Sequence, residues 1–106
     1  GDFQQIKKSL QKAIEVSADP LYEHIAKTYL GLGYILNNQI LEAEKQLNAA
    51  VTFCERNNAD WIGTPAKMMQ GIVMIAKGNM NKGIERIKET LDIFRSRERE
   101  IQVALT

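Results

Sequence analysis

The pattern of hydrophobic and polar positions between Tyr29 and Val51 recurs 40 residues further along the chain. When Gly31 is aligned with Gly71 (71 − 31 = 40), six further positions of the first segment align with similar residues of the second. The matched pairs are Tyr34 with Met74, Asn38 with Gly78, Ile40 with Met80, Ala43 with Gly83, Leu47 with Ile87 and Val51 with Leu91. A repeat of this length predicts stacked pairs of helices.

The spacing of apolar residues predicts five helices, over about 2–17, 20–37, 40–57, 60–77 and 80–97. Asp19 suits an N-cap and Pro20 a first helical position, which favours a helix start there. Asn38 and Gly78 are expected to end the second and fourth helices in the left-handed conformation. Two starts fit the fourth helix: Asp60 as the cap, or Thr64 as the cap with Pro65 next.

We therefore expect an all-α chain with a single domain of antiparallel helix hairpins, cut from a larger protein. Residues 2–18 would be the second helix of a truncated repeat, 20–57 and 60–99 would be two repeats, and 100–106 would start a further helix. The inner face of the fifth helix is expected to carry Met80, Gly83, Ile84, Ile87, Leu91 and Phe94, with charged residues outside.

These residues resemble the tetratricopeptide repeat, in which a Leu-Gly pair, an aromatic residue, a turn glycine and small residues recur. The matching positions are Leu30, Gly31, Tyr34, Ala43, Leu47 and Ala50 in one unit, and Gly71, Met74, Gly78, Gly83 and Ile87 in the next. Gln70 and Thr90 depart from the pattern, where leucine and a small apolar residue are usual. The resemblance implies a short right-handed α-solenoid.

The repeat is longer than the commonest form, which has about 34 residues. This length is similar to that of the degenerate repeats of bacterial regulatory ATPases, transcription activators and the C-terminal arms of some nucleotide cyclases. The segment Gly83 to Arg95 resembles those arms in particular.

In such repeats the first helix of each pair lines a concave surface. The matching positions here are Ile25, Thr28, Tyr29, Leu32 and Ile35 in one unit, and Pro65, Met68, Met69, Ile72 and Ile75 in the next. None of them is a Lys, Arg or Asn that could grip a terminal carboxylate, so that binding mode is rejected. Two interpretations stay open: the surface binds an apolar helix or strand, or these residues pack between repeats and against neighbouring parts of the parent protein.

The amino-acid composition limits the classes of partner that we expect this chain to bind. The chain has 14 Lys and Arg residues against 13 Asp and Glu residues, a net charge of +1, which gives no strong field for nucleic acid or anionic lipid. No apolar run approaches the roughly 18 residues that span a bilayer, and the N-terminal residues do not resemble a signal peptide. We expect a protein or peptide partner, no nucleic acid, no membrane and a cytoplasmic location.

The sequence contains few residues that could act in catalysis or metal binding. Cys54 is the single cysteine and shares an apolar stripe with Leu47, Ala50 and Val51, so we expect a core residue; His24 is the single histidine. With no catalytic set or phosphate loop, we expect no enzyme activity, no cofactor and no metal.

The expected function is therefore that of an interaction or scaffold module. The alternative is the regulatory arm of a signalling enzyme or transcription activator. A first helix without its partner also predicts self-association, with Phe3, Ile6 and Leu10 in the contact.

Overall fold

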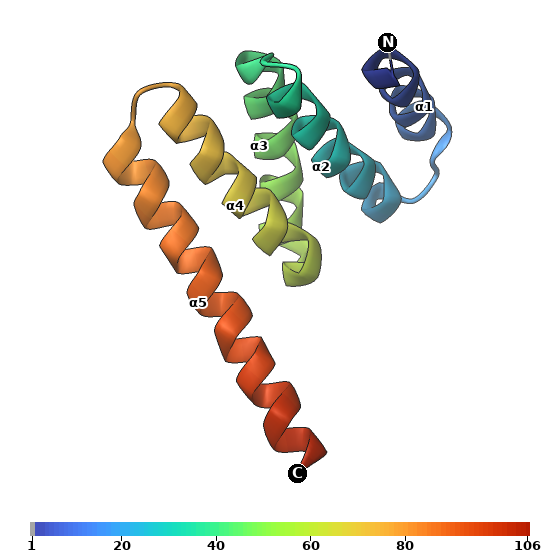
Figure 1. Cartoon of the computed structure of the whole chain (residues 1–106). Coiled ribbons are helices and arrows are strands. Elements are labelled where there is room, and N and C mark those ends of the chain that lie inside the picture. Colours follow the sequence, from blue (N-terminus) through green and yellow to red (C-terminus); the bar gives the residue numbers. More distant parts are fainter. Residues whose placement is uncertain (1) are drawn as a thin grey trace.

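In a computed structural model, which describes residues 2–106, the chain consists of five α-helices and, within this range, has no strand. The helices are α1 (Asp2–Val16), α2 (Pro20–Leu36), α3 (Ile40–Asn57), α4 (Asp60–Ala76) and α5 (Met80–Leu105). Each helix packs against the next one along the chain, and α2 also contacts α4 (Figure 1). The predicted all-α stack of helical hairpins is confirmed.

The stack is more extended than a compact domain of its size. The radius of gyration is 14.8 Å and the molecule measures 45 × 36 × 26 Å, whereas a compact domain of 100 residues has a radius of about 13 Å. The long α5 accounts for part of this difference, because its C-terminal end projects beyond α4 (Figure 1). The handedness of a longer superhelix stays a prediction.

The predicted helix boundaries at the first two turns are confirmed. Asp19 caps α2, because its side chain accepts a hydrogen bond of 2.9 Å from the backbone N–H of Leu21. At the other end of α2, Asn38 has a φ of 59°. The N–H of Gln39 then donates to the carbonyl of Tyr34 over 2.8 Å and the N–H of Asn38 to that of Ile35 over 3.0 Å. This pair of bonds is a Schellman motif, which satisfies the last carbonyls of the helix.

The same motif recurs 40 residues later, at the end of α4. Gly78 has a φ of 92°, the N–H of Asn79 donates to Met74 over 2.8 Å, and the N–H of Gly78 donates to Ile75 over 3.0 Å. The two hairpins α2–α3 and α4–α5 are therefore closed by turns of equal length and equal hydrogen bonding.

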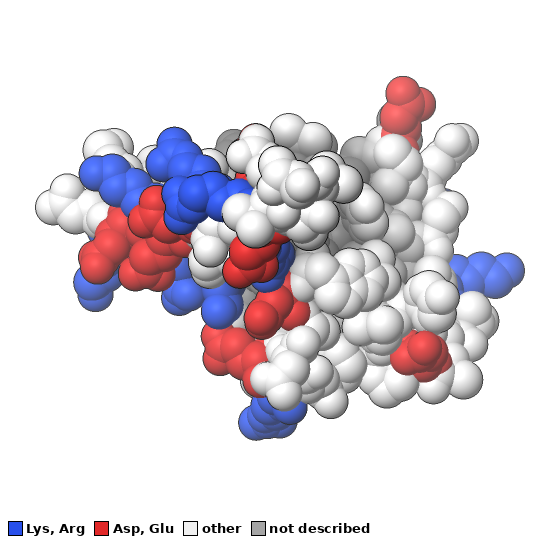
Figure 2. All heavy atoms as spheres, turned by 90° about the horizontal axis from the view of Figure 1, so that it is seen from below, with Lys and Arg blue, Asp and Glu red and all other residues white. Residues whose placement is uncertain are grey.

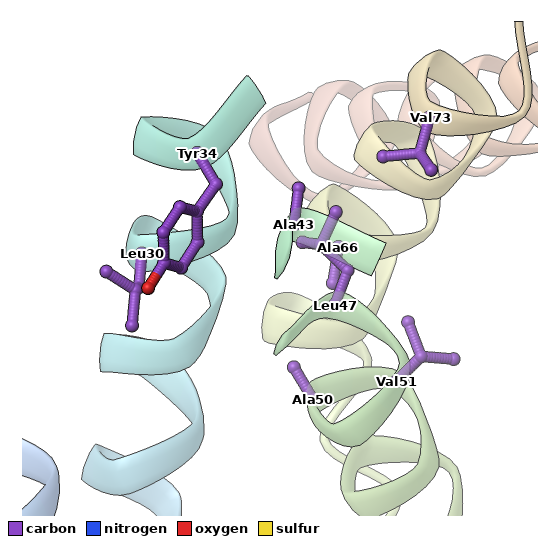
Figure 3. Packing of buried hydrophobic residues seen from close by; sticks show 8 residues of the cluster. All are labelled: Leu30, Tyr34, Ala43, Leu47, Ala50, Val51, Ala66 and Val73. Atoms are coloured by element: carbon purple, nitrogen blue, oxygen red, sulfur yellow. The ribbon is translucent and has the colours of Figure 1, made fainter. Parts of the chain in front are cut away.

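The core lies between α2, α3 and α4. Figure 3 shows eight of its buried side chains, with Leu30 and Tyr34 coming from α2, four residues from α3, and Ala66 and Val73 from α4. The four α3 residues are Ala43, Leu47, Ala50 and Val51, and three of them are fully buried. Because α3 is covered by α2 on one side and by α4 on the other, it is the central helix of the molecule.

In each hairpin, a glycine of the first helix lies against a side chain of the second helix. A Cβ placed on Gly31 would lie 2.7 Å from Leu47, and a Cβ placed on Gly71 would lie 2.7 Å from Ile87. These two pairs are related by the same step of 40 residues. The sequence repeat is thus a repeat of tertiary contacts as well.

The sequence allowed two starts for α4, and in the structure the helix begins at the earlier one. The helix begins at Asp60 after Ala59, and no side chain caps it. Pro65 therefore lies inside the helix, where its ring nitrogen cannot donate a hydrogen bond. Thr64 is buried and accepts a hydrogen bond of 3.1 Å from Arg97 instead of capping a helix.

The structure corrects the prediction that residues 100–106 start a further helix, because α5 continues without interruption to Leu105. Its inner face also differs from the prediction. Only Gly83 and Thr90 are buried on α5, whereas Met80, Ile84, Leu91 and Phe94 are exposed. Thr90 fits a buried position because its hydroxyl donates to the carbonyl of Ile87 over 2.7 Å.

Candidate functional site

Titratable groups do not gather into a chemical centre in the described part of the chain. No group of three or more His, Cys, Asp or Glu residues within 2–106 could hold a metal ion. In the same range, no helix combines the length and the hydropathy needed to cross a membrane.

His24 has structural contacts on both its edge and its face. Its Nδ1 lies 2.7 Å from the carbonyl oxygen of Pro20, one turn earlier in α2. Its ring stacks on Phe53 of α3 with a centroid distance of 4.1 Å and an interplanar angle of 4°. The ring is buried, and it packs α2 against α3.

Cys54 is a core residue, as expected, with 2% of its surface exposed. Burial raises the pKa of its thiol above the ordinary value of 9.0, Asp60 raises it further, and Lys67 partly offsets this. A raised pKa leaves less thiolate near neutral pH, which opposes use of Cys54 as a nucleophile or metal ligand.

An apolar pocket of about 200 Å³ lies between α2 and α4. It is lined by Ile25, Thr28 and Tyr29 from α2 and by Trp61, Ile62, Pro65 and Met69 from α4. Among the described residues, no charged side chain lines it. The pocket exists because α2 and α4, the first helices of the two hairpins, lie next to each other.

Two aromatic side chains stand at this pocket on opposite helices. Tyr29 is 60% exposed and Trp61 is 61% exposed, although both are large and mainly apolar. Exposed aromatic residues beside an apolar pocket are the typical anchors of protein interfaces. We call the seven lining residues the α2–α4 pocket.

The structure brings together five of the ten positions proposed for the concave surface. Ile25, Thr28, Tyr29, Pro65 and Met69 line the α2–α4 pocket. Leu32 and Met68 are half-buried and Ile72 is 39% exposed, outside the pocket lining.

The remaining two positions, Ile35 and Ile75, pack against other parts of the molecule. Ile35 packs against the core cluster. Ile75 lies against α5, because a Cβ on Gly83 would come within 2.6 Å of its Cγ1. The assignment of Ile75 to the concave surface is therefore corrected: it belongs to the α4–α5 contact.

Trp61 and Ile62 were missed as pocket residues. Both precede Pro65, and the later of the two possible starts of α4 would have left them outside the helix. The earlier start places Trp61 one turn before Pro65, on the same side of α4 as the pocket. The signal available in the sequence was the single tryptophan of the chain, which stands four residues before Pro65.

Charged residues are distributed unevenly over the surface. In Figure 2, Lys, Arg, Asp and Glu side chains gather on one half of the face in view, on the side of α5 in Figure 1. The other half, on the side of α1 and α2, is mainly uncharged, with isolated charges. The mixed signs on the charged half agree with a solvated surface rather than a phosphate-binding one.

The residues expected in a self-association contact are mostly occupied within the molecule. Phe3 meets Tyr34 edge to face with a centroid distance of 5.6 Å, and Leu10 packs against the core cluster. Ile6 alone of the three is exposed, at 54%. Phe3 and Leu10 thus pack against α2 and the core, and the self-association of the chain stays a prediction.

Comparison with known proteins adds no relative: no family model, no curated protein and no solved structure matches the chain. The likeness to tetratricopeptide repeats therefore rests on the residues of the repeat.

Proposed function

We propose that this chain is a non-catalytic protein-interaction module of the tetratricopeptide-repeat type, which presents the surface between α2 and α4 to an apolar segment of a partner protein. The observation that carries the proposal is the α2–α4 pocket, which is apolar, uncharged and bordered by two exposed aromatic side chains. Burial of such side chains is the main source of affinity in protein interfaces.

The apolar surface extends from the pocket along both helices. Tyr22, Leu36 and Ile72 are exposed, and Leu32 and Met68 are half-buried. Single exposed apolar residues are ordinary on a soluble protein, but a continuous row on two adjacent helices favours a binding surface.

Arginine substitutions on this surface test the proposal. The double variant Leu32→Arg, Ile72→Arg places two charges on the proposed surface, and the matched control Leu41→Arg places one on α3, where Leu41 is 68% exposed. The wild-type chain and both variants are immobilised and exposed to native lysate, and each protein that is retained is purified and titrated against all three.

We expect a partner that binds the wild type and Leu41→Arg with equal affinity and binds the double variant at least about tenfold more weakly. Circular dichroism confirms that the variants are folded. Equal binding to all three proteins, or retention of no protein by the wild type, would overturn the proposal.

A second candidate function is the regulatory arm of a signalling enzyme or transcription activator, in which these helices contact other domains of the same parent protein. The exposed face of α5 favours it. Val51 and Cys54 of α3 are 6% and 2% exposed, but their equivalents on α5, Leu91 and Phe94, are each 36% exposed. The helix α4 covers the face of α3 that carries Val51 and Cys54. No described element covers the equivalent face of α5.

Cross-linking distinguishes the two candidates. A Leu91→Cys variant of the parent protein carries a photo-crosslinker at that position, while Cys54 is too buried to compete. Cross-links to another domain of the same chain support the regulatory arm. If the photo-crosslinker reacts only with solvent and forms no such cross-link, this counts against the regulatory arm.

A further inference from the structure

We propose that the α2–α4 pocket takes up one aromatic side chain of the partner, a Phe or Tyr ring inserted between Tyr29 and Trp61. This inference rests on the proposed function and specifies which chemistry the site recognises. Size, charge and the character of the pocket border each support it.

The volume of the pocket suits a single side chain. It measures about 200 Å³, whereas pockets for cofactors and drug-sized ligands have about 300–1,000 Å³. An apolar cavity of about 150 Å³ holds one benzene ring. The α2–α4 pocket therefore has room for one ring with its methylene group.

The polarity of the pocket excludes a charged side chain. All seven lining residues are uncharged, and Thr28 already donates its hydroxyl proton to the carbonyl of His24 over 2.9 Å. Lys27 of α2 and Lys67 of α4 are paired with Glu23 and Glu55 over 3.3 Å and 3.6 Å. A charge inserted here would lose its hydration without gaining a partner, so the complementary group is uncharged.

The residues at the border favour an aromatic ring over an aliphatic side chain. Tyr29 and Trp61 present aromatic groups from two different helices, and aromatic pairs gain from edge-to-face or offset contact. Met69 adds a thioether, which makes favourable contacts with ring edges. Pro65 provides a rigid apolar wall inside α4.

The single tryptophan makes the pocket directly observable. The probe is N-acetyl-phenylalaninamide, titrated into the whole chain while the indole N–H resonance of Trp61 is followed by NMR. We expect saturable shifts with a dissociation constant on the order of 1 mM, which is typical of a ligand of this size. N-acetyl-leucinamide is expected to bind more weakly, and N-acetyl-lysinamide is expected to cause no saturable shift.

Two tyrosines of α2 provide a matched pair of variants. Tyr29 lines the pocket and Tyr22 does not, yet they are 60% and 65% exposed. Tyr29→Ala should weaken binding of the phenylalanine probe about tenfold, and Tyr22→Ala should leave it unchanged. Both positions are exposed, so neither change is expected to unfold the protein, which the amide spectrum of each variant verifies.

The outcomes separate this inference from the proposed function. Absence of a saturable Trp61 shift with the phenylalanine probe, or equal shifts with the lysine probe, would overturn the aromatic pocket. A partner lost from the Leu32→Arg, Ile72→Arg protein while the probe fails would keep the interaction surface and overturn this inference alone. Equal weakening by Tyr22→Ala and Tyr29→Ala would also overturn it.

Discussion

Gly71 of α4 and Gly83 of α5 lie backbone against backbone. A Cβ on Gly83 would come within 2.6 Å of the Gly71 carbonyl oxygen, and a Cβ on Gly71 would come within 2.9 Å of the Gly83 carbonyl oxygen. No side-chain movement can relieve such contacts, because both atoms belong to the backbone. The second hairpin depends on these two glycines for the close approach of its helices.

Gly83→Ala should lower the free energy of unfolding by about 1–2 kcal/mol, because overpacking costs about 1–3 kcal/mol and the gain in helix propensity is at most about 1 kcal/mol. Urea unfolding of both proteins measures the difference. Gly33→Ala is the control, since the three atoms nearest to its Cβ all belong to the ring of Phe3 on α1, a side chain and not a backbone group. Equal losses in the two variants would contradict the backbone contact.

Gly78→Ala tests the turn between α4 and α5. Gly78 has a φ of 92°, and apart from its two chain neighbours no described atom lies within 4 Å of an added Cβ, so the cost is conformational and not steric. We expect a loss of about 1–2 kcal/mol in the free energy of unfolding. The neighbouring Asn79→Ala, at a φ of −91° and without a side-chain cap bond, should change stability little. A neutral Gly78→Ala would argue against the left-handed turn.

The raised pKa of Cys54 gives a stability change with a definite sign. A thiol with a folded-state pKa above its unfolded value of about 9 stabilises the protein fully below that pH. This contribution is lost as the pH rises through the folded-state pKa. The unfolding free energy of the wild type should therefore fall more steeply above pH 9 than that of Cys54→Ser, as measured by urea unfolding at several pH values. If the unfolding free energies of the two proteins change with pH in parallel, Cys54 makes no such contribution.

The same burial predicts slow thiol chemistry. Cys54 in the folded protein should react with Ellman's reagent far more slowly than in urea, because only the thiolate of an accessible cysteine attacks the disulfide. Equal rates in buffer and in urea would show that the α3–α4 contact opens freely.

Self-association should depend on α5 more than on α1. Ile84, Leu91 and Phe94 form an exposed apolar stripe, whereas Ile6 is the single exposed member of the three residues first expected in the contact. Sedimentation equilibrium over a concentration series compares the wild type with Leu91→Lys and Ile6→Lys. We expect Leu91→Lys to weaken the association and Ile6→Lys to have a smaller effect. The reverse order would restore α1 as the contact.

The start of α2 and the turns that end α2 and α4 could be predicted because they depend on local chemistry. Asp19, Asn38 and Gly78 adopt the predicted conformations, since a cap bond or a positive φ is decided by a residue and its immediate neighbours. The core positions of α3, such as Leu47 and Val51, could also be predicted, because helices cover both sides of α3 and its apolar stripe matches what is buried.

The sequence by itself determined the all-α hairpin stack, the step of 40 residues and an apolar first helix in each hairpin. The tertiary structure decided which of these apolar residues face a pocket, which face the core and which stay uncovered. The start of α4 brought Trp61 to the pocket, and the rotation of α5 against α4 buried Thr90 while leaving Leu91 exposed. Helical spacing defines an apolar stripe, but the way two neighbouring helices pack determines which part of that stripe is covered.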